Sequence, residues 1–225
     1  MSAFPLLSLF AFLLLLLLLP MLFGELMVTS LVKLHLSPEA ALLLMIAIIV
    51  GGLVNIPVKR IARERVVPAH PLAVFGLGGL WPGVRRERRE TIIAINVGGC
   101  VIPTGLALYE LLQLVAQGAP ALLAVLASIV NIAVCYFLAR PVQGVGILLP
   151  GLVPAAVAAI LALIFAPSAA AAPVAYVAGV AGPLIGADLL HLKEIEQSTV
   201  GMASIGGAGT FDGIVLSGIV AAYLA

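Results

Sequence analysis

Seven long apolar stretches dominate this chain of 225 residues. An α-helix needs about 20 apolar residues to cross the hydrocarbon core of a bilayer. The stretches run over residues 4–23, 40–56, 91–116, 120–139, 144–166, 172–192 and 206–224. Only 9% of the residues are charged, against about 25% in a typical soluble domain. This excludes a soluble globular protein, a nucleic-acid binder and a disordered chain. It predicts an all-α integral membrane protein with about seven transmembrane helices in a single domain over residues 1–225.

Basic residues predict the orientation of these helices. Eight of the 11 Lys and Arg residues lie between Lys59 and Arg89, in the loop after the second stretch. With seven crossings, Arg140 and Lys193 fall on the same side as that loop, and Lys33 falls opposite. Because cytoplasmic loops carry an excess of Lys and Arg, we expect the basic loops and the N-terminus to be cytoplasmic.

The long loop over residues 57–90 has a pattern of its own. Two basic clusters flank an apolar centre that contains Val74, Phe75 and the turn-forming sequences GLGG and WPG. Short β-rich runs separated by such turns favour a small hairpin at the membrane surface. We expect the basic residues over 59–89 to meet anionic lipid headgroups, at about 1 kcal/mol per basic residue. The alternative is a docking site for a protein partner.

Glycine and proline interrupt several of the apolar stretches. The sequences NIP, NVGG, IPTG, AGPLIGAD and GGAGTFDG all lie inside or beside predicted helices. Proline removes a backbone hydrogen bond, and glycine lets the backbone open or a neighbour approach. In lipid, such irregular backbone persists only where protein or a water-filled cavity covers it. The breaks indicate an internal cavity, with close packing of small residues as the alternative.

Three acidic residues lie within predicted helices. A charged side chain there costs several kcal/mol, so such residues are functional candidates by default. Glu110 lies near the outer end of its helix, and we expect a structural or interfacial role for it. Asp188 and Asp212 lie on either side of a short loop, so their helices are antiparallel neighbours with both carboxylates at similar depth on the cytoplasmic side. Residues expected to support this pair, partly by admitting another backbone, are Asn96, Pro103, Gly186, Gly207, Gly209 and Thr210.

Two carboxyl groups that share a site hold a single proton between them. One then activates water as a general base, and its protonated partner polarises a peptide carbonyl. This is aspartyl protease chemistry, and it needs no metal or cofactor. The sequence thus predicts an intramembrane aspartyl protease that cleaves membrane-embedded peptides, with Asp188 and Asp212 as its catalytic residues.

The segment GAGTFDGIVLSGIV is similar to the GxGD signature of presenilin and signal peptide peptidase-type intramembrane proteases. The resemblance implies the same two catalytic residues, Asp212 and Asp188. It departs from the signature in having two residues between the second glycine and the aspartate, and no PAL triplet follows. Most of the chain resembles an uncharacterised prokaryotic family of polytopic membrane proteins with NIP, NVGG, IPTG, GADLLHL and GGAGTFDG patterns, which implies a prokaryotic plasma membrane.

Other functions stay open at this point. Asp188, His191 and Asp212 could together bind a cation, although no metal motif such as HExxH is present. A cation- or proton-coupled transporter would use the same aspartates, together with the intramembrane residues Asn55, Asn96 and Asn131. In a non-catalytic assembly protein, the aspartates would only form hydrogen bonds. A homo-oligomer is compatible with each of these functions. Cys100 and Cys135 lie in apolar runs and are expected to be buried and unpaired.

Overall fold

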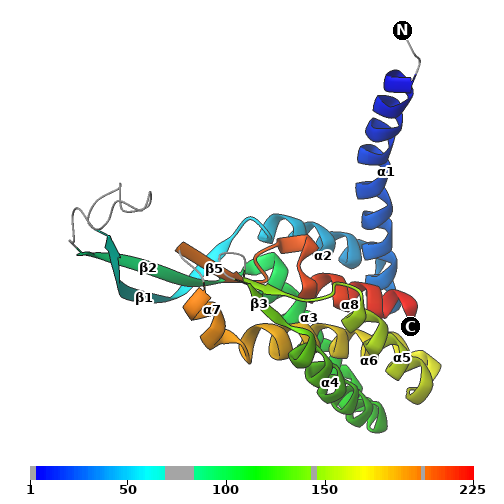
Figure 1. Ribbon diagram of the computed structural model, residues 1–225. Helices are drawn as coiled ribbons and strands as arrows, with labels where there is room; N and C mark the ends of the chain where they lie inside the picture. Colours follow the sequence, from blue (N-terminus) through cyan, green and yellow to red (C-terminus); the bar gives the residue numbers. More distant parts are fainter. Residues whose placement is uncertain (1–3, 69–83, 143–145, 199–200) are drawn as a thin grey trace.

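The computed structural model describes residues 4–68, 84–142, 146–198 and 201–225 of the chain (Figure 1). Its α-helices are α1 (Phe4–Lys33), α2 (Pro38–Gly51), α3 (Ile102–Gln117), α4 (Ala119–Leu138), α5 (Val153–Phe165), α6 (Ser168–Ala181), α7 (Leu192–Ser198) and α8 (Gly213–Leu224). Two π-helical segments, η3 (Val97–Val101) and η4 (Gly182–Leu189), and a short 3₁₀ helix, η5 (Gly209–Phe211), adjoin them. The strands are β1 (Asn55–Pro68), β2 (Val84–Asn96), β3 (Arg140–Val142), β4 (Gly146–Leu148) and β5 (Gly201–Ile205).

Long apolar helices make this a membrane-embedded, mainly helical protein. Within the described residues, four helices are long and apolar enough to cross a membrane: Ser8–Lys33, Val97–Gln117, Ala119–Leu138 and Ser168–Leu189. The other three predicted stretches form the shorter apolar helices α2, α5 and α8. Helix length alone therefore supports four of the seven predicted crossings.

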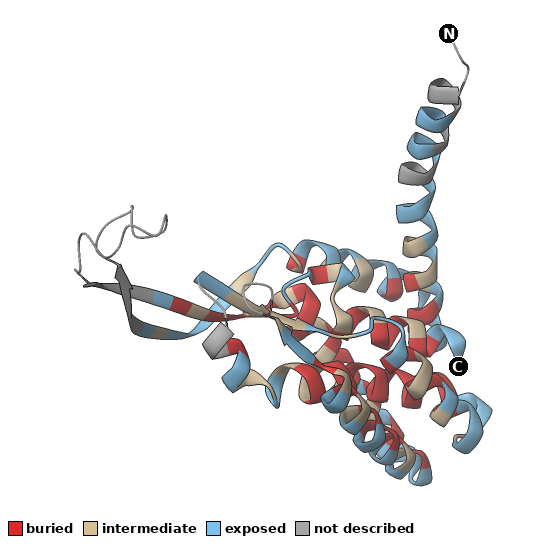
Figure 2. Ribbon diagram, in the orientation of Figure 1, coloured by how far each residue is buried: buried red, intermediate tan, exposed pale blue. Residues whose placement is uncertain are grey.

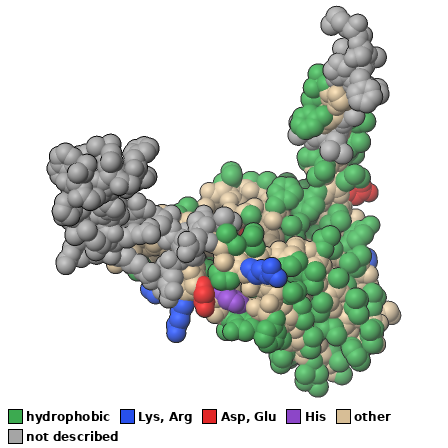
Figure 3. Space-filling view, in the orientation of Figure 1, with side chains coloured by type: hydrophobic (Ala, Val, Ile, Leu, Met, Phe, Trp, Pro, Cys, Tyr) green, Lys and Arg blue, Asp and Glu red, His purple; other side chains and the backbone are tan. Residues whose placement is uncertain are grey.

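Helix α6 lies at the centre of the helical bundle. Of the most apolar 18 residues of the span Ser168–Leu189, 78% are buried, whereas none of the most apolar 18 residues of α1 is. Helix α6 contacts α3, α4, α5 and α8. Small residues make this position feasible, because the sequence SAAAAPVAYVAGVA lets neighbouring helices approach closely. Buried residues concentrate around α6 in Figure 2, while the N-terminal part of α1 extends away from the bundle and only its last turns contact it. Hydrophobic side chains also cover most of the bundle face in Figure 3, as lipid contact requires.

A three-stranded sheet in the order β1-β2-β5 lies beside the bundle. Strands β1 and β2 form an antiparallel hairpin that is longer than the predicted small hairpin, with Asn55 paired with Asn96 at its base. The predicted turn region, with Val74 and Phe75, lies outside the described residues, as do the side chains of Arg85–Arg89. Strand β5 pairs parallel to β2, from Thr91 opposite Gly201 to Ile95 opposite Ile205.

Three of the predicted helices begin later than expected. Residues 91–96 continue β2 rather than opening a helix, because this β-branched run pairs with both β1 and β5. Residues 146–148 pair with β3, and the fifth helix begins only at Val153, just before Pro154. The last helix begins at Gly213 rather than 206, after the turn that contains Gly206 and Gly209, both with positive φ.

Candidate functional site

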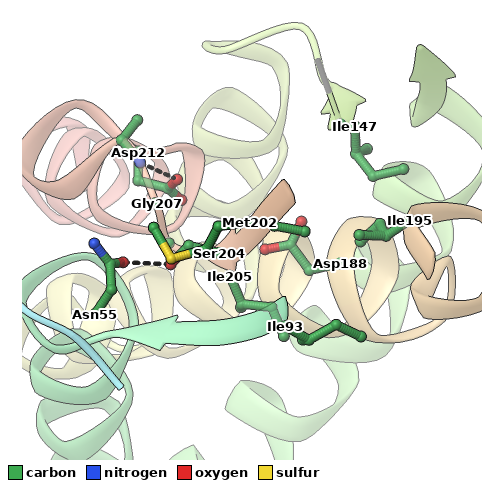
Figure 4. Close-up of a pocket in the computed structure, with 14 residues that line it drawn as sticks. Asn55, Ile93, Ile147, Asp188, Ile195, Met202, Ser204, Ile205, Gly207 and Asp212 are labelled. Carbon is green, nitrogen blue, oxygen red and sulfur yellow. Dashed lines mark hydrogen bonds between the residues drawn. The ribbon is translucent and has the colours of Figure 1, made fainter. Parts of the chain in front are cut away.

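A cavity of about 440 Å³ lies where the sheet meets the bundle, and both Asp188 and Asp212 line it. It is bordered by η4, by β5 and by the turn that leads into α8 (Figure 4). Three separate stretches of chain thus bring the two aspartates to one cavity. In Figure 4, the two carboxylates lie apart, with the β5 residues Met202 and Ser204 between them in that view.

Asp212 is the N-cap residue of α8. Its Oδ1 accepts a hydrogen bond from the backbone N–H of Ile214 at 3.0 Å, and its Oδ2 accepts one from Ala208 N–H at 3.3 Å. An Asp at this position satisfies N–H groups that the first turn of a helix leaves free. The carboxylate therefore has a structural partner on each oxygen while it also borders the cavity.

Asp188 has a different environment. It lies near the end of η4, where Gly182 and Pro183 follow the regular turns of α6. Its side chain is partly buried, and within the described part of the chain no hydrogen bond or ion pair involves its carboxylate. A partly buried, unpaired carboxylate in a π-helical segment is a common feature of functional sites.

A hydrogen-bond network builds the cavity wall next to Asp212. The fully buried Asn96 caps η3 by accepting from Gly99 N–H at 2.7 Å, and its Nδ2 donates to Gly52 O at 2.8 Å and to Asn55 Oδ1 at 3.1 Å. Asn55 lines the cavity, and its Oδ1 also accepts from the hydroxyl of Ser204. The NVGG sequence thus ties the ends of β1, β2 and β5 together at one wall.

Glycine is required where the backbones in this wall touch. A Cβ at Gly98 would collide with the backbone of Ile48 and Gly52, and one at Gly99 would collide with the carbonyl of Gly206. Gly206 itself has a φ of +72°, which favours glycine. Helix α2, segment η3 and the turn before α8 are therefore packed backbone to backbone.

The other expected supporting residues divide into two groups. Gly207 lines the cavity, and Gly209, with a φ of +61°, forms the turn that leads to Asp212. Pro103 lies away from the cavity, where its carbonyl accepts a 3.4 Å hydrogen bond from Tyr176. Gly186 faces α4, where a Cβ would collide with the backbone carbonyl of Ile132, so this glycine admits a neighbouring backbone two residues before Asp188.

Neither Asn96 nor Thr210 lines the cavity. Asn96 lies behind the cavity wall and contacts it through its hydrogen bond to Asn55. Thr210 is partly buried in η5.

The sequence did not predict the β5 residues Met202–Ile205, which form much of the cavity wall. The only signal in the sequence was a short apolar run between glycines, which is too weak to separate a strand from a loop.

A family comparison covers this whole site. A model for a family described as "Protein of unknown function (DUF1614)" matches residues 49–224. The chain belongs to the DUF1614 family. The matched part of this DUF1614 protein contains every residue that lines the cavity, from Asn55 to Asp212, whereas α1 lies outside it. No curated protein and no solved structure matches the chain.

Among the described residues of this DUF1614 protein, His191 does not lie with the two aspartates at the cavity. The His191 Nδ1 lies 3.1 Å from the carbonyl oxygens of Gly186 and Ala187, and its ring packs on Tyr136 at 4.8 Å. His191 does not line the cavity, and the described residues contain no group of three or more His, Cys, Asp or Glu side chains that could hold a metal ion.

Both cysteines, Cys100 and Cys135, are buried and free of disulfides.

Proposed function

We propose that this protein is an intramembrane aspartyl protease in which Asp188 and Asp212 form the catalytic pair. The observation that carries the proposal is that two aspartates from different helical elements border one cavity. A cavity of about 440 Å³ has room for water and for a segment of peptide. The similarity of the sequence around Asp212 to the GxGD signature also supports the proposal.

The strand β5 supports a peptide as the substrate. Its position at the end of the sheet order β1-β2-β5 leaves one edge without a partner in the described sheet, and its residues 202–205 line the cavity. An extended peptide can add to such an edge through main-chain hydrogen bonds. This arrangement would present an unwound substrate segment, whose carbonyl groups are accessible, to the two carboxyl groups.

The proposed reaction proceeds by general acid–base catalysis. One carboxylate takes a proton from water as the water oxygen attacks the peptide carbonyl carbon, and the other carboxyl group gives its proton to the carbonyl oxygen. The resulting gem-diol collapses as the C–N bond breaks: the carboxyl group that took the water proton gives it to the amine nitrogen, and the other carboxylate takes a proton from a gem-diol hydroxyl. Because the two carboxyl groups lie apart in this structure (Figure 4), substrate binding must bring them to a common water molecule.

We also propose the orientation and location that the basic residues indicate. With seven crossings, the cavity lies on the side of the basic loop over 59–89, which would be the cytoplasmic side of a prokaryotic plasma membrane. The anionic headgroups of that leaflet would attract the basic loop. Cysteine labelling from each side, with one cysteine introduced at Lys193 and one at Lys33, tests this orientation, because the two positions must react from opposite sides.

Cleavage in liposomes tests the proposed activity. The purified protein is reconstituted with single-span peptides that carry a fluorophore and a quencher on opposite sides of the cleavage region. Cleavage should fall to background in both Asp188→Asn and Asp212→Asn. Asn caps a helix as well as Asp does, so Asp212→Asn removes the acid while its side-chain oxygen can still accept from Ile214 N–H at the start of α8.

The matched control is Glu194→Gln, which changes an exposed carboxyl group on α7 outside the cavity. This variant should cleave at the wild-type rate. Full activity in either Asp→Asn variant would overturn the proposal. The capping of α8 by Asp212 favours a non-catalytic assembly role as the alternative. That role gains support if the wild type cleaves no peptide and the Asp→Asn variants lose assembly with another protein.

A cation- or proton-coupled transporter is the second candidate, and the irregular helix ends beside the cavity favour it. Segment η3 forms the first turn of the span Val97–Gln117 and η4 the last turns of Ser168–Leu189, and transporters place ion sites at irregular helix ends of this kind. In that case, the same liposomes should show cation or proton uptake that Asp188→Asn abolishes, with the peptides left intact.

A further inference from the structure

A second cavity, of about 230 Å³, lies far from the two aspartates. It is bordered by the turn after α1, by the second half of α3 and by Pro173 near the start of α6. Pro173 is 15 residues before Asp188 on the continuous helix α6–η4, which corresponds to about 22 Å along the axis. The two cavities therefore open at opposite ends of the bundle.

Glu110 on α3 lines this second cavity, and its side chain is only 2% exposed. Its Oε1 is fully buried and has no hydrogen-bond partner among the described residues. Buried polar atoms in folded proteins nearly always have a partner, so an exception calls for a bound water molecule or ion. The sequence predicted only a structural or interfacial role for Glu110, whereas its burial places it inside a cavity.

The mouth of this cavity provides further oxygen ligands. Tyr109, Gln113 and Gln117 line it from α3, and all three side chains are exposed. The Nε2 of Gln113 donates to the hydroxyl of Tyr109 at 2.9 Å, which leaves the amide oxygen of Gln113 available as a ligand. Amide, hydroxyl and carboxylate oxygens together are suitable ligands for a hard cation or for an ammonium group.

We propose that the Glu110 cavity binds a monovalent cation. Glu110 is the only carboxyl group among the residues that line it, and His35 is the only side chain there that could itself carry a positive charge; with His35 neutral, one bound positive charge balances the site. A single carboxylate favours a monovalent ion over a divalent one, which usually needs several. The volume exceeds that of a bare ion, since one water molecule takes about 30 Å³. The ligand is therefore a partly hydrated alkali-metal ion or the ammonium group of a small amine.

Binding and thermal stability measurements on the purified full-length protein test this site. Unfolding is followed at constant ionic strength while Na⁺, K⁺ or ethylammonium replaces the bulky cation N-methylglucamine. A ligand that binds only the folded state raises the apparent Tm, here by about 5 °C or more at saturation. The same samples are tested for ²²Na⁺ binding and for its displacement by K⁺ and ethylammonium. A response to Na⁺ or K⁺ identifies a metal ion, and a response to ethylammonium alone identifies an ammonium group.

Three variants make the test specific. Glu110→Gln should abolish the Tm response and ²²Na⁺ binding, and Gln113→Leu at the exposed mouth should weaken binding several-fold without unfolding the protein. Glu25→Gln, the same kind of change at an exposed position on α1, should respond like the wild type. A wild type whose Tm is the same in all four cations would overturn the proposal, as would an undiminished response in Glu110→Gln.

The cation site is independent of the proposed proteolysis. Asp188→Asn should keep the full cation response, because Asp188 lies at the opposite end of the bundle. Loss of the response in Glu110→Gln together with loss of cleavage in Asp188→Asn would establish two separate sites.

Discussion

The side-chain nitrogen of Asn96 donates a 3.1 Å hydrogen bond to the side-chain oxygen of Asn55, linking the last residue of β2 to the first residue of β1. The two residues are also register partners in the hairpin. Asn96 is completely buried, whereas Asn55 lines the cavity with the aspartates. This pair therefore connects the base of the hairpin to the candidate site.

Asn96→Ala should lower the free energy of unfolding by about 3 kcal/mol, because it leaves Gly99 N–H and Gly52 O without a partner in a buried wall. Reversible unfolding in mixed detergent micelles measures this loss. Asn55→Ala, at a partly exposed position, is the comparison and should cost about 1 kcal/mol. Equal stability of the Asn96→Ala variant and the wild type would show that the network does not hold the wall together.

Gly99→Ala should destabilise the protein strongly, since the new methyl group would collide with the carbonyl oxygen of Gly206. Overpacking of this kind costs about 1–3 kcal/mol or more. Gly105→Ala is the matched control on the same helix, with nothing within 4 Å of the added Cβ. It should stabilise the protein by about 0.5–1 kcal/mol through the lower helix propensity of glycine. The apparent Tm values should therefore move in opposite directions, and a shared direction would contradict the close contact at Gly99.

Much of the helical structure could be predicted because apolar length and composition are local signals. The predicted stretches over 120–139 and 172–192 correspond closely to α4 and to α6–η4. The short connection between Asp188 and Asp212 also indicated that the two residues lie close to one part of the fold, and both do line one cavity. Their catalytic role stays a prediction.

Long-range pairing explains what could not be predicted. Strand β5 pairs with β2, more than 100 residues earlier in the chain, and no local pattern identifies that partner. The same pairing holds residues 91–96 in a strand, although their apolar composition suits a membrane helix equally well. Gly186 was expected to admit another backbone near Asp188, but a glycine in a sequence does not show which neighbour that is, and here the neighbour is α4.

Asp188→Asn should leave the free energy of unfolding unchanged or raise it by up to about 1 kcal/mol. The reason is that the Asp188 carboxylate has no hydrogen-bond partner among the described residues and shares its cavity with a second carboxylate. Functional residues of this kind are commonly suboptimal for stability. The same unfolding assay measures the change, and a loss of more than about 1 kcal/mol would assign Asp188 a structural role.

Asp212 should show the opposite behaviour, because its two carboxylate oxygens accept from Ala208 N–H and Ile214 N–H at the start of α8. Asp212→Ala should cost about 1 kcal/mol, the usual effect of losing a helix cap, whereas Asp212→Asn and Asp212→Ser keep one oxygen for Ile214 N–H, give up only the longer, exposed bond from Ala208 N–H, and should cost less. Unfolding and cleavage measured on the same three variants separate the two roles of this residue. If Asp212→Asn and Asp212→Ser are stable but inactive, the acid is needed for chemistry. If stability and activity fall together only in Asp212→Ala, the carboxylate serves as a cap alone.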